Sequence, residues 1–355
     1  MGSSLPGLEI LNDETGVSEI EDICEGNEVM EEKEEEKYLG DVISRDGKNI
    51  KNVKARVAKG TGIVNRIMTI LEGIPFGKFY FEVAVILRNS LLVSSMLCNS
   101  ESWYNVTKPE LDLLETVDVH LLRRILKAPK STPKEMLYLE LGCVPLRELI
   151  RKRRISFCQY ILKQSPSSML YRFLESQLKG RKPKDWISQV LVDIQELKLN
   201  LDLEEIKLMK KSKLKSILNN AVKVKALEEL NKIKASHSKV EKVKHNYLEM
   251  QKYLKPNDLK MTKENAETIF KMRSRVTEVK INYRGKYETL ECDLCSEEEE
   301  TQEHILKCKE IIKETNNDKE LEYSKLLDGN MNNQLEIAKI FTENMKRRKK
   351  LLDKK

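Results

Sequence analysis

The sequence predicts a mainly α-helical protein, and three observations lead to that prediction. In a chain of 355 residues, Gly (14) and Pro (9) are sparse, and aromatic residues make up only 6%. Leu, Ile, Lys and Glu dominate, and this mix favours helix over strand. Apolar positions also recur at helical spacing over several long segments. The chain is long enough for two or three domains with a sizeable core.

Charge is unevenly distributed along the chain. Residues 1–36 hold thirteen Asp and Glu against one Lys, a net charge of −12, and the whole chain carries +7, so residues 37–355 carry +19. The acidic head, 1–36, has too little apolar sequence to fold alone and is predicted to be disordered. The basic remainder attracts polyanions, of which nucleic acid is the commonest large one. The head either competes with nucleic acid for this remainder or acts only as a solubilising tail.

Residues 37–165 carry the clearest helical patterns. YLGDVI at 38–43 predicts a short strand, and the segment Ser44–Gly47 predicts a turn. Thr107 with Glu110, and Thr132 with Glu135, have the spacing of capping boxes. The apolar spacing predicts helices over 48–72, 79–97, 107–127 and 147–163. The apolar positions that we expect to be buried are Val57, Val64, Leu114, Leu121, Ile125, Ile155 and Leu162.

Residues 166–260 are predicted to form a basic helical linker, interrupted at Pro166, Gly180 and Pro183. Arginine and lysine near this linker are candidates for phosphate contact, since Arg offers a planar fork for phosphate and can stack on bases. The nucleic-acid contacts that we predict are Arg151, Lys152, Arg153, Arg154, Arg273 and Arg275. Tyr283 and Tyr287, on a hairpin-like stretch at 279–292, either stack on bases or pack under the turn that follows.

A cysteine and histidine pattern near the C-terminus predicts a metal site. Cys292, Cys295, His304 and Cys308 follow the order C-x2-C-x8-H-x3-C. The first two cysteines fit a tight turn, and His304 and Cys308 would share one face of a helix. Three thiolates and one imidazole form a closed tetrahedral set for structural Zn²⁺. The alternative is a turn with buried thiols and one surface histidine. We place the zinc module at 261–315 and a basic C-terminal helix at 316–355.

Several of these segments resemble segments of a known protein family and follow one another in the same order. The segments that carry the resemblance are YLGDVISRDGKNIKNVKARVAKGTGIVNRIMTIL, LRRILKAPKSTPKEMLYLELGCVPL and the later HSK and MQKYL. They are similar to the C-terminal part of non-LTR retrotransposon reverse transcriptases. The resemblance implies that YLG belongs to the primer grip and that residues 37–165 form a thumb-like helical bundle. It also implies that 166–260 is the linker and that the Cys–His pattern is the CCHC motif after the polymerase. It covers roughly residues 37–350.

The same resemblance exposes a missing part. Two-metal nucleotidyl transfer needs carboxylates that converge on Mg²⁺ ions, and the family supplies them upstream of YLG. No Asp-Asp pair occurs anywhere in this chain. We therefore expect no enzyme activity from the chain alone; an upstream palm domain of the same element is a possible partner. A truncated gene copy, a fragment with a wrongly assigned start and a domesticated remnant all fit.

Two functions follow as hypotheses. The first is a nucleic-acid-binding remnant of a reverse transcriptase, which holds RNA or DNA with its basic helical surface and its zinc motif. The alternative is a helical protein-interaction scaffold with a purely structural zinc site. No apolar run reaches ~18–20 residues, so no membrane association is expected. The sparse cysteines favour a reducing, intracellular location, and we favour the nucleus over the cytoplasm.

Overall fold

The computed structural model describes residues 24–25, 28–29, 33–38, 40–77, 79–180, 182, 185–255, 261–313 and 323–354. The predicted disorder of the head, 1–36, falls mostly outside the described residues. The chain divides into two compact units, residues 1–48 and residues 49–355.

The first unit contains two antiparallel hairpins. In one, β1 (Cys24–Glu25) pairs with β2 (Glu28–Val29), and in the other, β3 (Glu35–Tyr38) pairs with β4 (Asp41–Ser44). The prediction of one strand over 38–43 is wrong, because Gly40 takes a φ of 91° and the chain reverses there. The turn predicted at Ser44–Gly47 is confirmed, since Gly47 N donates to Ser44 O at 3.0 Å.

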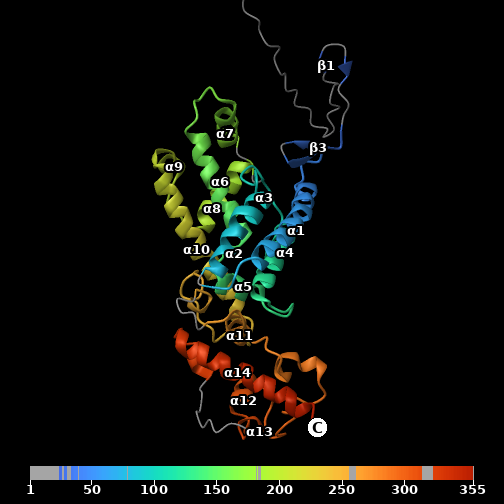
Figure 1. Ribbon diagram of the computed structural model, residues 1–355. Coiled ribbons are helices and arrows are strands. Elements are labelled where there is room, and N and C mark those ends of the chain that lie inside the picture. The colour runs from blue at the N-terminus through green and yellow to red at the C-terminus, as the bar shows by residue number, and fades with distance from the viewer. Residues whose placement is uncertain are drawn as a thin grey trace, which may run out of the picture. The chain divides into compact units, whose positions relative to one another are not determined.

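The second unit is helical (Figure 1). Its first part comprises α1 (Ile50–Glu72), α2 (Tyr80–Leu87), the π-helical turn η1 (Arg88–Val93), α3 (Ser94–Met96), α4 (Lys108–Leu126), α5 (Lys134–Leu141) and α6 (Leu146–Leu162). Next come α7 (Met169–Lys179), α8 (Trp186–Glu196), α9 (Leu203–Leu208), α10 (Lys211–Ala235) and the 3-10 turn η2 (Lys252–Leu254). The C-terminal part comprises α11 (Lys263–Arg273), η3 (Lys280–Lys286), α12 (Gln302–Lys307), α13 (Lys309–Ile312), η4 (Tyr323–Leu326) and α14 (Met331–Leu352). The mainly helical fold class is therefore confirmed.

The helices predicted between residues 48 and 163 match the structure closely, with one internal difference. The segment predicted as a single helix over 79–97 contains the π-helical turn η1. Arg88 lies buried at the start of that turn, and its Nε and Nη2 donate to the two carboxylate oxygens of Asp118 at 2.6 and 2.5 Å. The wider turn thus coincides with a buried ion pair between this segment and α4.

One of the two predicted capping boxes forms. Thr107 N donates to Glu110 Oε2 at 2.7 Å at the start of α4. The box predicted at Thr132 is wrong, because Pro133 takes an extended ψ of 130° and is itself the N-cap of α5. Thr132 consequently lies outside the helix, and its Oγ1 is buried without a hydrogen-bond partner among the described residues.

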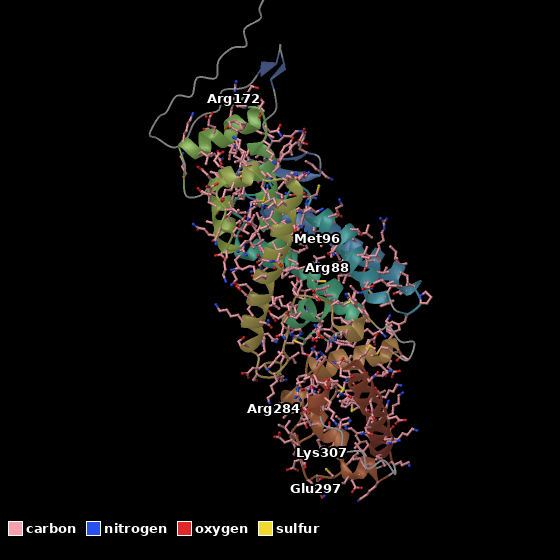
Figure 2. All side chains as sticks on the ribbon, turned by 90° about the vertical axis from the view of Figure 1, so that its left-hand side faces the viewer. Arg88, Met96, Arg172, Arg284, Glu297 and Lys307 are labelled. Atoms are coloured by element: carbon pink, nitrogen blue, oxygen red, sulfur yellow. The ribbon has the colours of Figure 1, made fainter. Side chains whose placement is uncertain are left out.

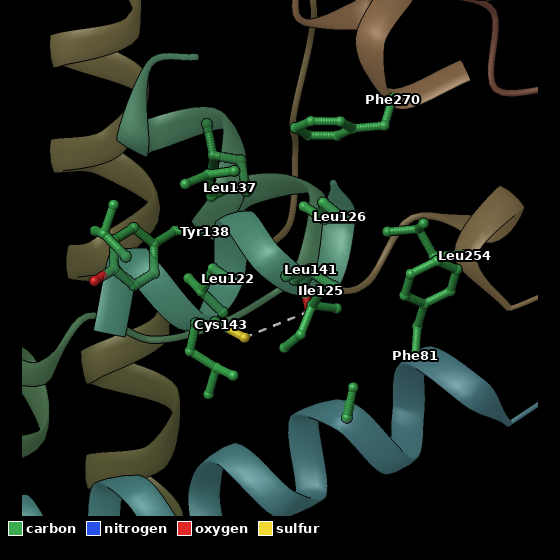
Figure 3. Packing of buried hydrophobic residues seen from close by; sticks show 14 of the residues in the cluster. Phe81, Leu122, Ile125, Leu126, Leu137, Tyr138, Leu141, Cys143, Leu254 and Phe270 are labelled. Carbon is green, nitrogen blue, oxygen red and sulfur yellow. Dashed lines mark hydrogen bonds between the residues drawn. The ribbon is translucent and has the colours of Figure 1, made fainter. Parts of the chain in front are cut away.

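Beside a small cluster of Met136, Val240 and Val243, two large apolar clusters form most of the core of the second unit. The larger one runs from α1 through α4 and α5 to α11 and α14, and Figure 3 shows part of it, with Phe81, Ile125 and Phe270. The smaller one joins α6 to α7, α8, α9 and α10, and contains Ile155 and Leu162. All positions predicted to be buried are buried except Val57, which is half-buried. Arg56 is buried beside it instead, and its Nη1 donates to Ser95 O at 2.9 Å.

The linker and the C-terminal helix are packed parts of this unit. Residues 166–235 are largely helical as predicted, but residues 236–251 are irregular, and Gln251 N donates to Glu140 O at 2.9 Å. The helix α14 packs on α11, α12 and α13. Its Asn344 Nδ2 donates to Ile305 O at 2.9 Å. The predicted zinc module and C-terminal helix therefore share one core. In the described ranges, no helix combines the length and apolarity needed to cross a membrane.

Candidate metal centre and basic surfaces

The first two cysteines lie on a tight turn. Cys292 N donates to Glu298 O at 2.9 Å, and Ser296 N donates to Cys292 O at 2.8 Å. Glu291 and Glu299 form a β-bridge at the open end of the turn. The turn closes through a φ of 54° at Ser296. This local structure confirms the turn predicted from the C-x2-C spacing.

The other two candidate ligands come from the helix that follows. The Thr301 hydroxyl caps α12 by accepting from His304 N at 2.9 Å. The helix ends at Lys307, and Cys308 takes an extended ψ of 120° as the N-cap of α13. The expectation that His304 and Cys308 share one helix face is therefore wrong. The bend between α12 and α13 nevertheless brings Cys308 next to Cys292.

The four side chains converge on one point. Their ligand atoms all lie within 4.8 Å of one another. Cys292 Sγ lies 3.9 Å from Cys308 Sγ, and Cys295 Sγ lies 3.4 Å from His304 Nε2. Tetrahedral zinc with bonds of ~2.3 Å to sulfur and ~2.0 Å to nitrogen separates two sulfurs by about 3.8 Å and a sulfur from a nitrogen by about 3.5 Å. The observed spacings fit a four-coordinate metal ion of this size.

The surroundings favour a thiolate at Cys292 and a fixed imidazole at His304. A hydrogen bond from Cys308, opposed by burial, lowers the pKa of Cys292 to about 4, and backbone N–H groups of Cys295 and Leu294 act in the same direction. The same hydrogen bond raises the pKa of Cys308. His304 Nδ1 lies 3.2 Å from Glu298 Oε2, which leaves Nε2 for the metal. A carboxylate behind a histidine ligand is the usual arrangement at zinc sites.

This centre offers four ligand atoms from the protein to one metal ion. Cys292, His304 and Cys308 are buried, and Cys295 is half-buried. Three sulfurs and one nitrogen complete the preferred coordination of zinc, whereas catalytic zinc sites keep one position open. In Figure 2, Glu297 marks the cysteine turn and Lys307 marks the end of α12. The Cys–His cluster thus joins these two segments.

Two of the predicted nucleic-acid contacts are buried. Arg154 is 5% exposed, and its Nε donates to Asp193 Oδ2 at 2.7 Å. Arg273 is 3% exposed, and its Nε lies 3.0 and 3.1 Å from the two carboxylate oxygens of Glu140. Each guanidinium thus neutralises a carboxylate inside the protein, so we place no nucleic-acid contact on Arg154 or Arg273.

The other predicted contacts are half-buried, and three of them have protein partners. Arg151 Nη1 donates to Glu148 Oε1 at 2.7 Å, Arg153 lies 3.8 Å from Glu101, and Arg275 Nη1 lies 2.5 Å from Glu303 Oε1. Lys152 differs, because it has no acidic partner among the described residues. Burial and the nearby charges of Lys215 and Arg153 lower its pKa.

The sequence did not predict a second buried polar centre, which surrounds Glu140. Glu140 on α5 accepts from Arg273 and from Tyr253 Oη, the latter at 2.7 Å, and lies 2.9 Å from His245 Nε2. Although burial opposes ionisation of Glu140, the charge of Arg273 and the hydrogen bond of His245 lower its pKa to about 2. No local spacing predicts this centre, because the partners of Glu140 lie 105 to 133 residues away.

Comparisons with protein-family models, with curated proteins and with solved structures found no match to this chain. The resemblance to reverse transcriptases therefore stays a prediction that rests on the sequence segments.

Proposed function

We propose that this protein binds RNA or DNA through a basic face formed by α6 and α10. In this proposal it is a palm-less relative of the C-terminal part of non-LTR retrotransposon reverse transcriptases, and its zinc site is structural. The observation that carries the proposal is that α6 packs against α10 and brings Lys152 near Lys215. Burial and the charge of Lys215 lower the pKa of Lys152. Like charges kept close together without an acidic partner among the described residues are typical of surfaces that bind polyanions.

Neighbouring side chains extend this basic face. Lys211 and Lys215 are exposed on the first turns of α10. Lys163 follows α6, and its Nζ donates to Met209 O at 2.7 Å, which places it near the start of α10. Tyr160 is 53% exposed and stacks on Phe157 with ring centroids 5.9 Å apart. Exposed aromatic rings beside lysines suit single-stranded nucleic acid, because bases stack on them irrespective of sequence.

A salt series tests the proposal. The logarithm of affinity for a labelled RNA or DNA strand should fall by ~0.7–0.9 per contacted phosphate per log unit of salt. The double variant Lys152→Ala, Lys215→Ala should weaken binding to all sequences. It should also reduce this slope by about the amount that two phosphate contacts contribute. Lys179→Ala, Lys198→Ala is the matched control, since those lysines pair with Glu175 and Glu228 at the surface. An unchanged slope in the first variant would remove this face from the interface.

Two further arms sharpen the test. Removal of residues 1–36 should tighten binding, because it takes away −12 of competing charge. The chain alone should not extend a primer on a template, since it lacks the paired carboxylates that hold catalytic Mg²⁺. Template-dependent incorporation by the pure chain would contradict the proposal of a palm-less protein.

The protein-interaction scaffold is the second candidate function, and α7 favours it. Met169, Leu170 and Phe173 on this helix are 86%, 41% and 56% exposed. Phe173 and Trp186 line an apolar groove of about 520 Å³ between α6, α7 and α8. Apolar side chains gathered on one exposed face are a feature of protein-binding surfaces. An absence of RNA and DNA binding at low salt would favour this function over the first.

A further inference from the structure

A cavity of about 340 Å³ lies where four connecting segments meet. Its walls come from the residues before α5, those after α10, those after α11, and η3. Four serines line it together with His237, Lys239 and Arg275, and none of its described lining residues is acidic. Hydroxyl groups and cations form a lining that suits an anion. Carboxylates lie behind this lining, since Arg275 pairs with Glu303 and His237 Nε2 lies 3.8 Å from Glu135 Oε2.

A second cavity with basic lining residues differs from this one in its composition. The groove between α11 and α14, about 400 Å³ in volume, is lined by Lys271 and Lys346 but also by Glu264 and Glu278. Lys346 Nζ lies 3.8 Å from Glu264 Oε1. Acids thus line that groove itself, whereas none of the described residues that line the four-segment cavity is acidic.

A buried hydroxyl in the wall lacks a hydrogen-bond partner. Ser274 is 1% exposed and lines the cavity, and its Oγ has no hydrogen-bond partner among the described residues. The Oγ1 of Thr132 is in the same state, and Thr132 lies between the lining residues Ser131 and Pro133. A buried hydroxyl without a partner costs free energy that a bound acceptor would recover.

The cationic groups of the wall are held in place by the fold. Lys239 Nζ donates to Asn282 O at 3.1 Å. Arg275 pairs with Glu303, and its guanidinium lies 4.3 Å from the ring centroid of Tyr323. Arg284, labelled in Figure 2, belongs to η3. Burial and the charge of Arg284 lower the pKa of Lys239. A ligand would therefore meet cations that need little rearrangement.

A second explanation for the same cations comes from the helix ends. Ser236 and Ser274 are the C-caps of α10 and α11, and carbonyl groups at helix C-termini attract positive side chains. That explanation accounts for Lys239 and Arg275 but assigns no role to the Ser274 hydroxyl. The two explanations therefore differ in what removal of this hydroxyl does.

We infer that this cavity binds the phosphate group of a nucleotide, with the base against Tyr283. Tyr283 lines the cavity, and Lys286 Nζ lies 5.2 Å from its ring centroid. Serine hydroxyls and an arginine are the common donors to phosphate, and an aromatic ring accepts a base without regard to its identity. The inference rests on the proposed binding of nucleic acid and adds a second contact point, separate from the α6–α10 face.

Calorimetric titration of the whole chain with uridine 5′-monophosphate tests the inference, with uridine and inorganic phosphate as separate probes. The monophosphate should bind more tightly than either probe. Ser274→Ala should weaken it about tenfold, the effect of one hydrogen bond to a charged group. The same variant should keep the thermal stability of the wild type or exceed it, since it removes an unpartnered buried hydroxyl. Lys239→Ala should also weaken binding about tenfold.

Lys242→Ala is the matched control, because Lys242 is exposed in the same loop but does not line the cavity. It should bind the monophosphate as the wild type does. Equal affinity in wild type and Ser274→Ala, or equal affinity for inorganic phosphate and the monophosphate, would overturn the inference.

The experiment also separates this inference from the proposed function. The variant Lys152→Ala, Lys215→Ala should lose affinity for a long strand but keep its affinity for the monophosphate. If long RNA binds and the monophosphate does not, the cavity assignment fails alone. If the monophosphate binds and long RNA does not, the cavity assignment stands and the α6–α10 interface fails.

Discussion

The Cys–His centre and the Glu140 centre are both buried and polar. The residues of the first are close together in the sequence, whereas those of the second are far apart. The four metal-ligand candidates lie within residues 292–308, whereas Arg273 reaches Glu140 across 133 residues. The residues of the first centre lie on one turn and in or directly after the helix that follows it, and they have the ligand atoms for a metal ion. The second neutralises one carboxylate with groups from η2, α11 and the irregular segment after α10. A local centre can fold with its module, while a long-range centre depends on the whole unit.

Loss of the metal should have the largest effect. Zinc binding contributes on the order of 10 kcal/mol in comparable small modules. Cys292→Ser, or a strong chelator, should therefore unfold the segment around residues 285–310 and leave α1 and α4 folded. Hydrogen exchange followed by mass spectrometry measures both regions at once. Cys143→Ser is the control, because Cys143 is buried in the main core and belongs to no Cys–His cluster. Protection of residues 285–310 that survives both treatments would contradict the zinc assignment.

Breaking the Glu140 centre should come next. Glu140→Gln leaves Arg273 buried without its counter-charge, and loss of one partner of a buried pair costs about 3–5 kcal/mol. The destabilisation should appear in urea unfolding of the whole helical unit, unlike the local effect of Cys292→Ser. Glu249→Gln, at an exposed position three residues before η2, is the control and should change the unfolding free energy by less than about 0.5 kcal/mol. An equally small effect of Glu140→Gln would show that Arg273 finds another partner.

Acid should weaken the Glu140 centre over a defined range. The folded protein lowers the pKa of Glu140 from 4.5 to about 2. Its contribution to stability is therefore complete above about pH 4.5 and is lost as the pH falls toward about 2. The difference in unfolding free energy between wild type and Glu140→Gln should shrink by on the order of 3 kcal/mol over this interval. Urea titrations at several pH values measure it, and a difference that is independent of pH would contradict the ionised state of Glu140.

The smallest effect should come from the carboxylate behind the histidine ligand. Glu298→Gln should lower zinc affinity about 10- to 100-fold, because Glu298 orients the imidazole of His304. Glu297→Gln is the matched control, since Glu297 lies in the same turn but pairs with Lys309. Competition with a chromophoric chelator gives both affinities. Equal affinities in the two variants would assign His304 no support from Glu298.

The sequence predicted the parts of the fold that local rules govern. The capping box at Thr107, the apolar stripes of α1 and α4, and the Cys–His spacing all depend on residues a few positions apart. Two errors lie where distant partners decide. Arg154 and Arg273 look like exposed basic residues in a one-dimensional pattern, yet Asp193 and Glu140 hold them inside. Another error is local, because Pro133, next to Thr132, is itself the N-cap of α5.

The central proposal is that the Cys–His centre holds one structural zinc ion with no open position. X-ray absorption at the zinc edge, on protein whose metal content has been measured, tests it most directly. We expect one zinc per chain, three sulfur neighbours at ~2.3 Å and one nitrogen at ~2.0–2.1 Å. Less than one zinc after metal-replete expression, or a water oxygen in the coordination shell, would contradict the claim.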